Sequence, residues 1–167
     1  DSKPWGAPEA IANAMRRAWM SPYMCFPDFG GAIFGGNQQN LTQDQRFAWI
    51  TANAMSGGLV RWAGTSPAGL TEADMAILKR LLPAAKQAAR PVDMLENNPP
   101  RIWTIPVTTP LGSWNVTAVF NWDASAPQAV TLDFAALGME KGKPYTAFDF
   151  WQQRYSGLAQ DALSINV

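Results

Sequence analysis

The sequence contains no histidine and only one cysteine, Cys25, among its 167 residues. The chain therefore lacks the usual general base and the commonest metal ligand. A single cysteine excludes an intrachain disulfide and a cysteine-based zinc site, and Cys25, within an apolar run, is expected to be a small buried hydrophobic residue. Any catalysis by this chain must depend on carboxylates, and we expect neither a metal site nor a cofactor.

Charge is also sparse. Charged residues make up 16% of the chain, and 13 basic residues balance 13 acidic ones. This balance provides no net field to attract nucleic acid or an anionic membrane. No stretch approaches the roughly 18 apolar residues that a membrane-spanning helix needs. The apolar fraction of 47% indicates a globular protein with a sizeable core, so neither nucleic acid nor a membrane is an expected partner.

Helical and strand-like patterns alternate over the first half of the chain. Apolar residues recur at helical spacing in 8–20, 42–55 and 71–82, and short apolar runs occupy 23–29 and 59–62. Two strands separated by a long helix imply a parallel crossover. The first half is therefore predicted to be α/β, with two parallel strands that need further neighbours to be covered on both faces.

Two of these predicted helices begin with residues that are typical of helix N-caps. Thr42 and Gln45 match a capping box, and Thr71 is the expected N-cap of the third helix. The apolar face of that third helix is predicted to consist of Met75, Leu78 and Leu82.

The run 23–29 ends in a carboxylate, Asp28, followed by Gly30 and Gly31. An acid at the downstream end of a buried parallel strand lies where alternating strand–helix barrels place their sites. Asp28 could equally cap a turn. Trp62, at the end of the second strand, could form an apolar wall of the same pocket or simply pack in the core.

The second half changes character after a proline-rich stretch, 83–100, that is predicted to be a linker. Four β-branched or aromatic runs follow at roughly ten-residue spacing: 102–108, 114–122, 129–134 and 145–151. Such spacing is typical of an antiparallel sandwich. Four tryptophans lie in these runs, and they could stack on sugar rings or pack inside the protein; they are Trp103, Trp114, Trp122 and Trp151.

The order of several motifs resembles the end of a known enzyme family. In the first half they are PD at 27–28, LTQDQR at 41–46, AMSGGLV at 54–60 and LKRLLP at 78–83; in the second half they are WNVTAVFNW at 114–122 and YTAFDFW at 145–151. This order is similar to the last strands of the melibiase-type barrel and the β-sandwich that follows it. These proteins are the α-galactosidase-like glycoside hydrolases of the retaining clan.

The resemblance implies a division of the chain. Residues 1–82 would be the last βα units of a (β/α)8 barrel, 83–100 a linker, and 101–167 a C-terminal antiparallel β-sandwich. The fold class would be α/β followed by all-β. The substrate would be an α-galactoside-like carbohydrate, and the family favours a periplasmic or secreted location.

The resemblance also implies site residues. Asp28 matches the last acid of the family's Asn-Asp-Pro-Asp-like motif, which contacts sugar hydroxyls, although Cys25 and Phe26 replace the polar residues before it. Trp62 would line the substrate pocket. Asp1 is the candidate acid/base, and the nucleophile would lie upstream of this sequence.

An alternative remains open, in which the chain is a carbohydrate-binding or accessory β-sandwich module with a helical appendage. The sequence begins at Asp1 rather than Met and stops within an alternating apolar pattern at 163–167. We therefore expect a fragment that is inactive by itself. An upstream strand with a Lys-x-Asp nucleophile would favour the enzyme, and a start codon near Asp1 would favour the binding module.

Overall fold

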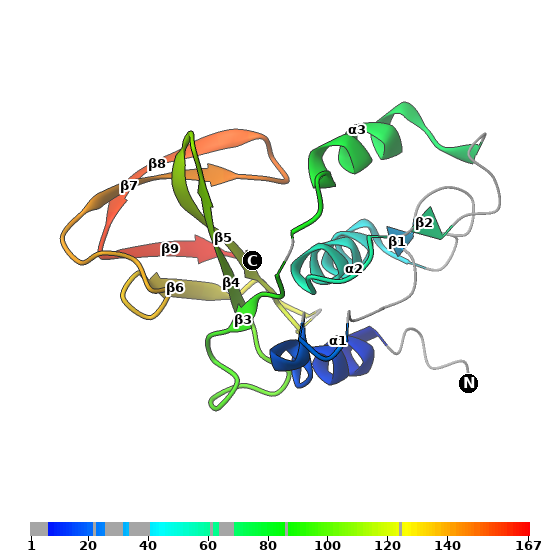
Figure 1. Ribbon diagram of the computed structural model, residues 1–167, viewed down its shortest axis with the longest axis horizontal. Helices are drawn as coiled ribbons and strands as arrows, with labels where there is room; N and C mark the ends of the chain where they lie inside the picture. Colours follow the sequence, from blue (N-terminus) through cyan, green and yellow to red (C-terminus); the bar gives the residue numbers. More distant parts are fainter. Residues whose placement is uncertain are drawn as a thin grey trace. The chain divides into compact units, whose positions relative to one another are not determined.

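A computed structural model describes residues 7–21, 23–25, 32–33, 41–60, 62–63, 69–85, 87–123 and 125–167 (Figure 1). The chain forms two compact units. We call Asp1–Ile105 with Val116–Phe120 the helical unit, and Pro106–Asn115 with Asn121–Val167 the strand unit. Each unit is described by itself.

The helical unit contains the predicted helices. They are α1 (Ala7–Met15), followed by a 3-10 turn η1 (Ala18–Met20), α2 (Gln43–Met55) and α3 (Glu72–Leu81). The capping box of α2 is confirmed, because the N–H of Gln45 donates to the Thr42 hydroxyl at 3.2 Å and the N–H of Thr42 donates to the Gln45 side chain at 3.0 Å. Thr71 is the N-cap of α3, as predicted.

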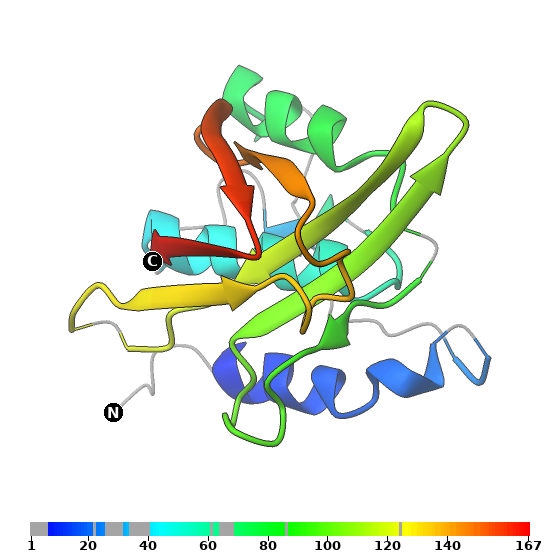
Figure 2. The ribbon, with the colours of Figure 1, turned by 90° about the vertical axis from the view of Figure 1, so that its left-hand side faces the viewer.

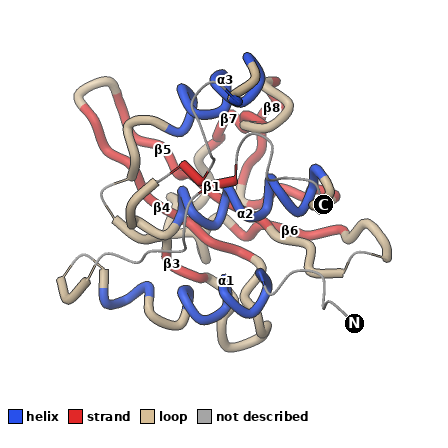
Figure 3. The backbone as a smooth tube through the Cα atoms, turned by 90° about the vertical axis from the view of Figure 1, so that its right-hand side faces the viewer, coloured by secondary structure: helices blue, strands red, loops and turns tan. Residues whose placement is uncertain are grey.

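Two short strands flank α2. Strand β1 (Ala32–Ile33) pairs in parallel with β2 (Trp62–Ala63), so that Ala32 lies opposite Trp62. Figure 3 shows β1 beside α2, which connects the two strands. A parallel crossover is therefore present, but its strands are Ala32–Ile33 and Trp62–Ala63 rather than the predicted runs 23–29 and 59–62.

The prediction of a buried strand from residue 23 is wrong for the part that the structure describes. Residues 23–25 form an exposed turn, in which the side chains of Tyr23 and Met24 are 90% and 68% exposed and Cys25 is exposed too. The N–H groups of Met24 and Cys25 both donate to the carbonyl of Met20. These bonds continue the turning path of η1 and leave neither N–H for strand pairing. Residues 26–31 lie outside the described part.

The predicted apolar face of α3 is wrong for two of its three residues. Met75 and Leu82 are 41% and 58% exposed, and Leu78 is half-buried, whereas Asp74 and Ile77 are the buried residues of the helix. Residues three apart share a face of a helix, so burying Asp74 brings Ile77 inward and turns the adjacent Met75 outward. The buried face of α3 therefore contains an acid, Asp74, beside the apolar Ile77.

The stretch that was predicted to be a linker contains a strand. Strand β3 (Arg90–Pro91) pairs antiparallel with β4 (Ile102–Thr109), which is followed by β5 (Gly112–Val119) in a three-stranded sheet. Trp103 in β4 is fully buried. Its ring nitrogen donates to the carbonyl of Pro100 at 3.2 Å. Core packing is therefore the correct interpretation for this tryptophan.

The strand unit is built from antiparallel pairs among its described residues. Strand β6 (Ala129–Asp133) pairs with β9 (Ala162–Asn166), and β7 (Pro144–Asp149) pairs with β8 (Arg154–Gln160). Figure 2 shows β6 in yellow next to β9 in red. Val130 and Leu132 are buried while their neighbours in β6 are exposed. This alternation confirms the predicted antiparallel β character of the second half.

The other three tryptophans differ from Trp103. Trp114 is 48% exposed, and Trp122 and Trp151 are half-buried. Of these four tryptophans, only Trp103 is therefore fully buried.

Candidate functional site

The sequence-predicted site residues are only partly placed. Asp1 and Asp28 lie outside the described residues. Trp62 lies in β2, where its backbone is paired with that of Ala32. Whether these three residues share a pocket therefore remains a prediction.

A helix follows each of the two parallel strands. The chain leaves β1 at Ile33 and enters α2 at Gln43, and it leaves β2 at Ala63 and enters α3 at Glu72. In a parallel strand–helix architecture the helix after each strand begins on the side of that strand's carboxyl end. Each of the two helices begins with a capping box.

A buried ion pair joins these two first turns. The guanidinium of Arg46, in α2, donates to Oδ1 of Asp74, in α3. The side chains are 17% and 4% exposed. The other oxygen of Asp74 accepts from the backbone N–H of Thr71 at 3.0 Å and from its hydroxyl at 2.8 Å. One carboxylate therefore completes the cap of its own helix and binds the neighbouring helix.

The electrostatic state of Asp74 follows from these contacts. Burial by itself raises the pKa of a carboxyl, but the hydrogen bonds from Thr71 and Arg46 and the positive charge of Arg46 stabilise the ionised form. The balance holds the pKa of Asp74 below its ordinary value of 3.8. At neutral pH the pair is therefore ionic.

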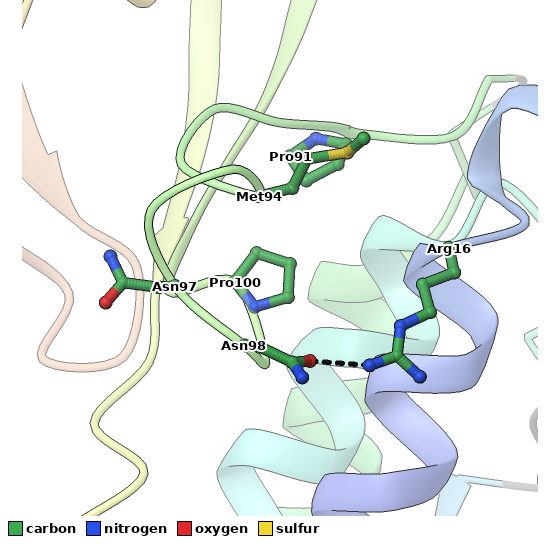
Figure 4. Close-up of a pocket in the computed structure, with 6 residues that line it drawn as sticks. All are labelled: Arg16, Pro91, Met94, Asn97, Asn98 and Pro100. Carbon is green, nitrogen blue, oxygen red and sulfur yellow. Dashed lines mark hydrogen bonds between the residues drawn. The ribbon is translucent and has the colours of Figure 1, made fainter.

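A crevice lies elsewhere in the helical unit, between α1 and the turn 91–100. It consists of two adjoining hollows of about 240 and 310 Å³ that share Arg16 and Asn98. The guanidinium of Arg16 donates to the side-chain carbonyl of Asn98 at 2.7 Å (Figure 4). The positively charged Arg16, the negatively charged Glu9 and neutral amides such as Asn13 line the crevice beside proline rings. This lining can hydrogen-bond a small polar molecule, but it contains no pair of carboxylates.

A second buried carboxylate organises the turn beside this crevice. Asp93 accepts from the backbone N–H groups of Arg101 at 3.0 Å and Ile102 at 2.9 Å, and from the side-chain amide of Asn97 at 2.9 Å. These donors tie the proline-rich turn to the start of β4. Asp93 is thus a structural residue, and it holds one wall of the crevice in place.

The described residues show no metal centre and no membrane-spanning element. No group of three or more potential metal-ligating side chains gathers among them. None of the helices in the described ranges is long and apolar enough to cross a membrane.

The second half of the chain matches a known family. Residues 97–167 match the model of the alpha galactosidase C-terminal beta sandwich domain. Over these residues the chain is similar to that family, and the resemblance seen in the sequence motifs is confirmed for them. The matched region includes the strands from β4 to β9. No curated protein matches this chain significantly.

Two solved structures share the fold over nearly the whole chain. Both are of a GH27 β-L-arabinopyranosidase from Geobacillus stearothermophilus, one wild-type and one a substituted form in complex with arabinose. Their TM-scores are 0.70 and 0.71 at sequence identities of 15% and 17%. Each comparison covers 98% of this chain and 40% of the other. The chain therefore spans about 40% of the length of those proteins, and the likeness shows the fold alone.

Sequence reasoning missed the link between α2 and α3. The spacing of Thr71 and Asp74 fits a capping box with an acid in its fourth position, so the role of Asp74 at the cap was readable. Its bond to Arg46 was not, because the two residues are 28 positions apart. Asp93 lies within the stretch 83–100 that the sequence predicts to be a linker, and no local pattern indicates that three N–H donors converge on it.

Proposed function

We propose that this chain is the C-terminal part of a retaining glycoside hydrolase that acts on α-galactoside-like sugars. In this proposal residues 1–82 are the last βα units of a (β/α)8 barrel, and residues 101–167 are the β-sandwich that follows it. One observation carries the proposal: the region similar to the alpha galactosidase C-terminal domain comes after two parallel strands and two helices, β1–α2–β2–α3, in the chain.

The substrate class rests on two observations. The matched family is named for α-galactosidase, and the two structures of similar fold are of a β-L-arabinopyranosidase. L-Arabinopyranose has the ring hydroxyl configuration of D-galactopyranose and lacks only the hydroxymethyl group. A pocket for either sugar therefore needs the same contacts to the ring hydroxyls, and both α-galactosides and β-L-arabinopyranosides belong to the proposed substrate class.

The roles within the proposed site follow the chemistry of retaining enzymes. Such enzymes use two carboxyl groups about 5–5.5 Å apart, one as nucleophile and one as acid/base. Asp28 would orient the sugar through its hydroxyls, Trp62 would form an apolar wall, and Asp1 would be the acid/base. The two buried acids described above, Asp74 and Asp93, are held by hydrogen bonds in structural roles. The nucleophile would come from sequence upstream of residue 1.

The proposed function is tested with a longer chain that includes the upstream sequence. Nitrophenyl α-galactoside and nitrophenyl β-L-arabinopyranoside are supplied, and the anomeric configuration of the first-formed sugar is followed by proton NMR. We expect release of sugar with retained configuration, and loss of turnover in Asp28→Asn. Asp123→Asn, at an exposed acid of the strand unit, is the control and should be active.

Failure to release sugar from a full panel of α-glycosides would reject the proposal. A start codon close to Asp1, together with sugar binding without turnover, would instead identify an accessory carbohydrate-binding module. The upstream sequence therefore discriminates between the two hypotheses before any assay.

A further inference from the structure

The crevice between α1 and the turn 91–100 has a polar part and a more apolar part. The larger hollow, of about 310 Å³, has mostly polar side chains on its walls: Glu9, Asn13, Arg16 and Asn98. The smaller, of about 240 Å³, adds three apolar ones: Pro91, Met94 and Pro100. Ligand pockets usually measure roughly 300–1,000 Å³. The two hollows together therefore suit a small ligand of one or two rings that has both polar and apolar surface.

Helical spacing brings the polar groups of α1 to the crevice. Glu9, Asn13 and Arg16 are four and three residues apart, so they lie on one face of the helix. The backbone N–H of Arg16 donates to the carbonyl of Ala12 at 3.1 Å, which continues the helical path to Arg16 beyond the end of α1. Ile11, on the other side of the helix, is fully buried. Burial of that side holds the polar face in place.

The opposite wall is fixed by hydrogen bonds to the start of β4. Asp93 accepts from the N–H groups of Arg101 and Ile102. The carbonyl of Pro100 accepts from the ring nitrogen of Trp103 at 3.2 Å. Both walls belong to the same compact unit. A preformed crevice of this kind lowers the ordering cost of binding a ligand.

One hydrogen bond joins the two walls. The guanidinium of Arg16 donates to the side-chain carbonyl of Asn98 at 2.7 Å (Figure 4). This bond uses the acceptor of the amide, so the NH2 group of Asn98 can donate to a ligand. A guanidinium has five N–H donors, so Arg16 can bond a ligand as well as Asn98. The carboxylate of Glu9, in the same hollow, provides an acceptor.

These groups suit a neutral molecule with several hydroxyls. A hydroxyl both donates and accepts, and the polar hollow provides a carboxylate, a guanidinium and amides. Because Glu9 and Arg16 carry opposite charges in one hollow, neither an anion nor a cation is favoured there. Proline rings provide an apolar wall for C–H groups. Glu9 is the one carboxylate in the lining, and retaining hydrolysis needs two, so a sugar bound there would not be cleaved.

We propose that the crevice between α1 and the turn 91–100 is an accessory binding site for a neutral pyranose sugar. Glu9, Arg16 and Asn98 bind its hydroxyls, and the proline rings pack against its C–H groups. The site goes beyond the proposed function, because it uses neither Asp28 nor any residue upstream of the chain. Only the choice of galactose as the probe rests on that function.

The test measures D-galactose binding by saturation-transfer NMR. The parent is the longer chain with Asp28→Asn, which weakens the proposed substrate pocket and leaves the crevice unchanged. Arg16→Met and Glu9→Gln are the test variants. Arg17→Met and Glu72→Gln are the matched controls, because both residues are exposed and lie outside the lining of the crevice. The melting temperature of each variant shows whether it is folded.

We expect Arg16→Met and Glu9→Gln to weaken galactose binding about tenfold or more, since each removes a charged hydrogen-bond partner. Both controls should bind as the parent does. D-Galacturonate should bind the parent less tightly than D-galactose, because its added carboxylate would be repelled by Glu9. If Arg16→Met fails to fold, Glu9→Gln beside Glu72→Gln still decides the outcome.

Equal galactose binding by Arg16→Met and Arg17→Met, or no binding by the parent, would overturn the accessory site. Tighter binding of galacturonate than of galactose would identify an anion site and overturn the assignment to a neutral sugar. Turnover is assayed separately with Asp28 intact. Galactose binding that depends on Arg16 in a chain without turnover would reject the proposed function alone. Turnover without such binding would reject this inference alone.

Discussion

The rings of Trp103 and Phe120 pack against each other inside the helical unit, with centroids 4.8 Å apart and planes tilted by 50°. Trp103 is fully buried and Phe120 is 3% exposed. The N–H of Phe120 also donates to the carbonyl of Arg101 at 2.8 Å, which connects the end of β5 to the start of β4. This aromatic pair joins segments that are 17 positions apart in the sequence, and its loss should be costly.

Trp103→Ala should lower the free energy of unfolding by about 3–5 kcal/mol, as large-to-small replacements of buried aromatic residues do. Denaturant unfolding of wild type and variant measures this difference. Trp114→Ala provides the control, because Trp114 is 48% exposed and its truncation should cost under about 1 kcal/mol. Equal losses for the two variants would contradict the assignment of Trp103 to the core.

Asp93→Ala should lower the free energy of unfolding by about 2–4 kcal/mol, because hydrogen bonds to a charged group are strong and their donors would be left without an acceptor. The donors are the N–H groups of Arg101 and Ile102 and the amide of Asn97. Glu96→Gln, at an exposed neighbouring acid, should differ little from the wild type. A loss for Asp93→Ala as small as that for Glu96→Gln would show that Asp93 does not anchor the turn.

Capping is the part of the fold that was most readable from sequence. A capping box is confined to four consecutive residues, so Thr42 with Gln45 could be identified without knowledge of the rest of the fold. The β-rich second half was also readable, since alternation such as that around Val130 and Leu132 has a direct cause in burial. Strand β8 shows no such alternation of buried and exposed residues, because nearly all of its residues are exposed, including Tyr155 and Leu158.

Other features depend on contacts that sequence patterns do not contain. The apolar run from residue 23 looked like a strand, but at Met24 and Cys25 the chain turns back to bond Met20. The buried acid of α3, Asp74, accepts a hydrogen bond from Arg46, which lies in another helix. Asp28 was predicted to be a site residue from its place after an apolar run. It lies outside the described residues, so its role stays a prediction.

The contribution of Asp74 to stability should depend on pH in one direction. Its pKa is lowered in the folded state, mainly because hydrogen bonds from Thr71 and Arg46 outweigh the effect of burial. A group with a lowered pKa contributes stability above its unfolded pKa, and this contribution is lost as the pH falls through the folded value. The difference in unfolding free energy between wild type and Asp74→Asn should therefore be constant near neutral pH and shrink below pH 3.8. A difference that grows on acidification would contradict the ionised pair.

Residues 1–167 expressed alone should self-associate or be poorly stable. Strands β1 and β2 form a sheet of two among the described residues. Parallel sheets are normally covered on both faces, and unpaired strand edges invite association. Sedimentation or light scattering measures the size in solution. A stable, monodisperse monomer would show that the helical unit needs no further strands.

Turnover of nitrophenyl α-galactoside by residues 1–167, assayed beside the longer chain that includes the upstream sequence, tests the central claim most directly. A double displacement needs a nucleophile and an acid/base in one pocket, and in the proposed function the nucleophile would come from sequence upstream of residue 1. We predict that the longer chain releases nitrophenol and that residues 1–167 release none above the buffer blank. Turnover by residues 1–167 alone that is abolished in Asp28→Asn would contradict the account, because it would mean that this chain contains a complete active site.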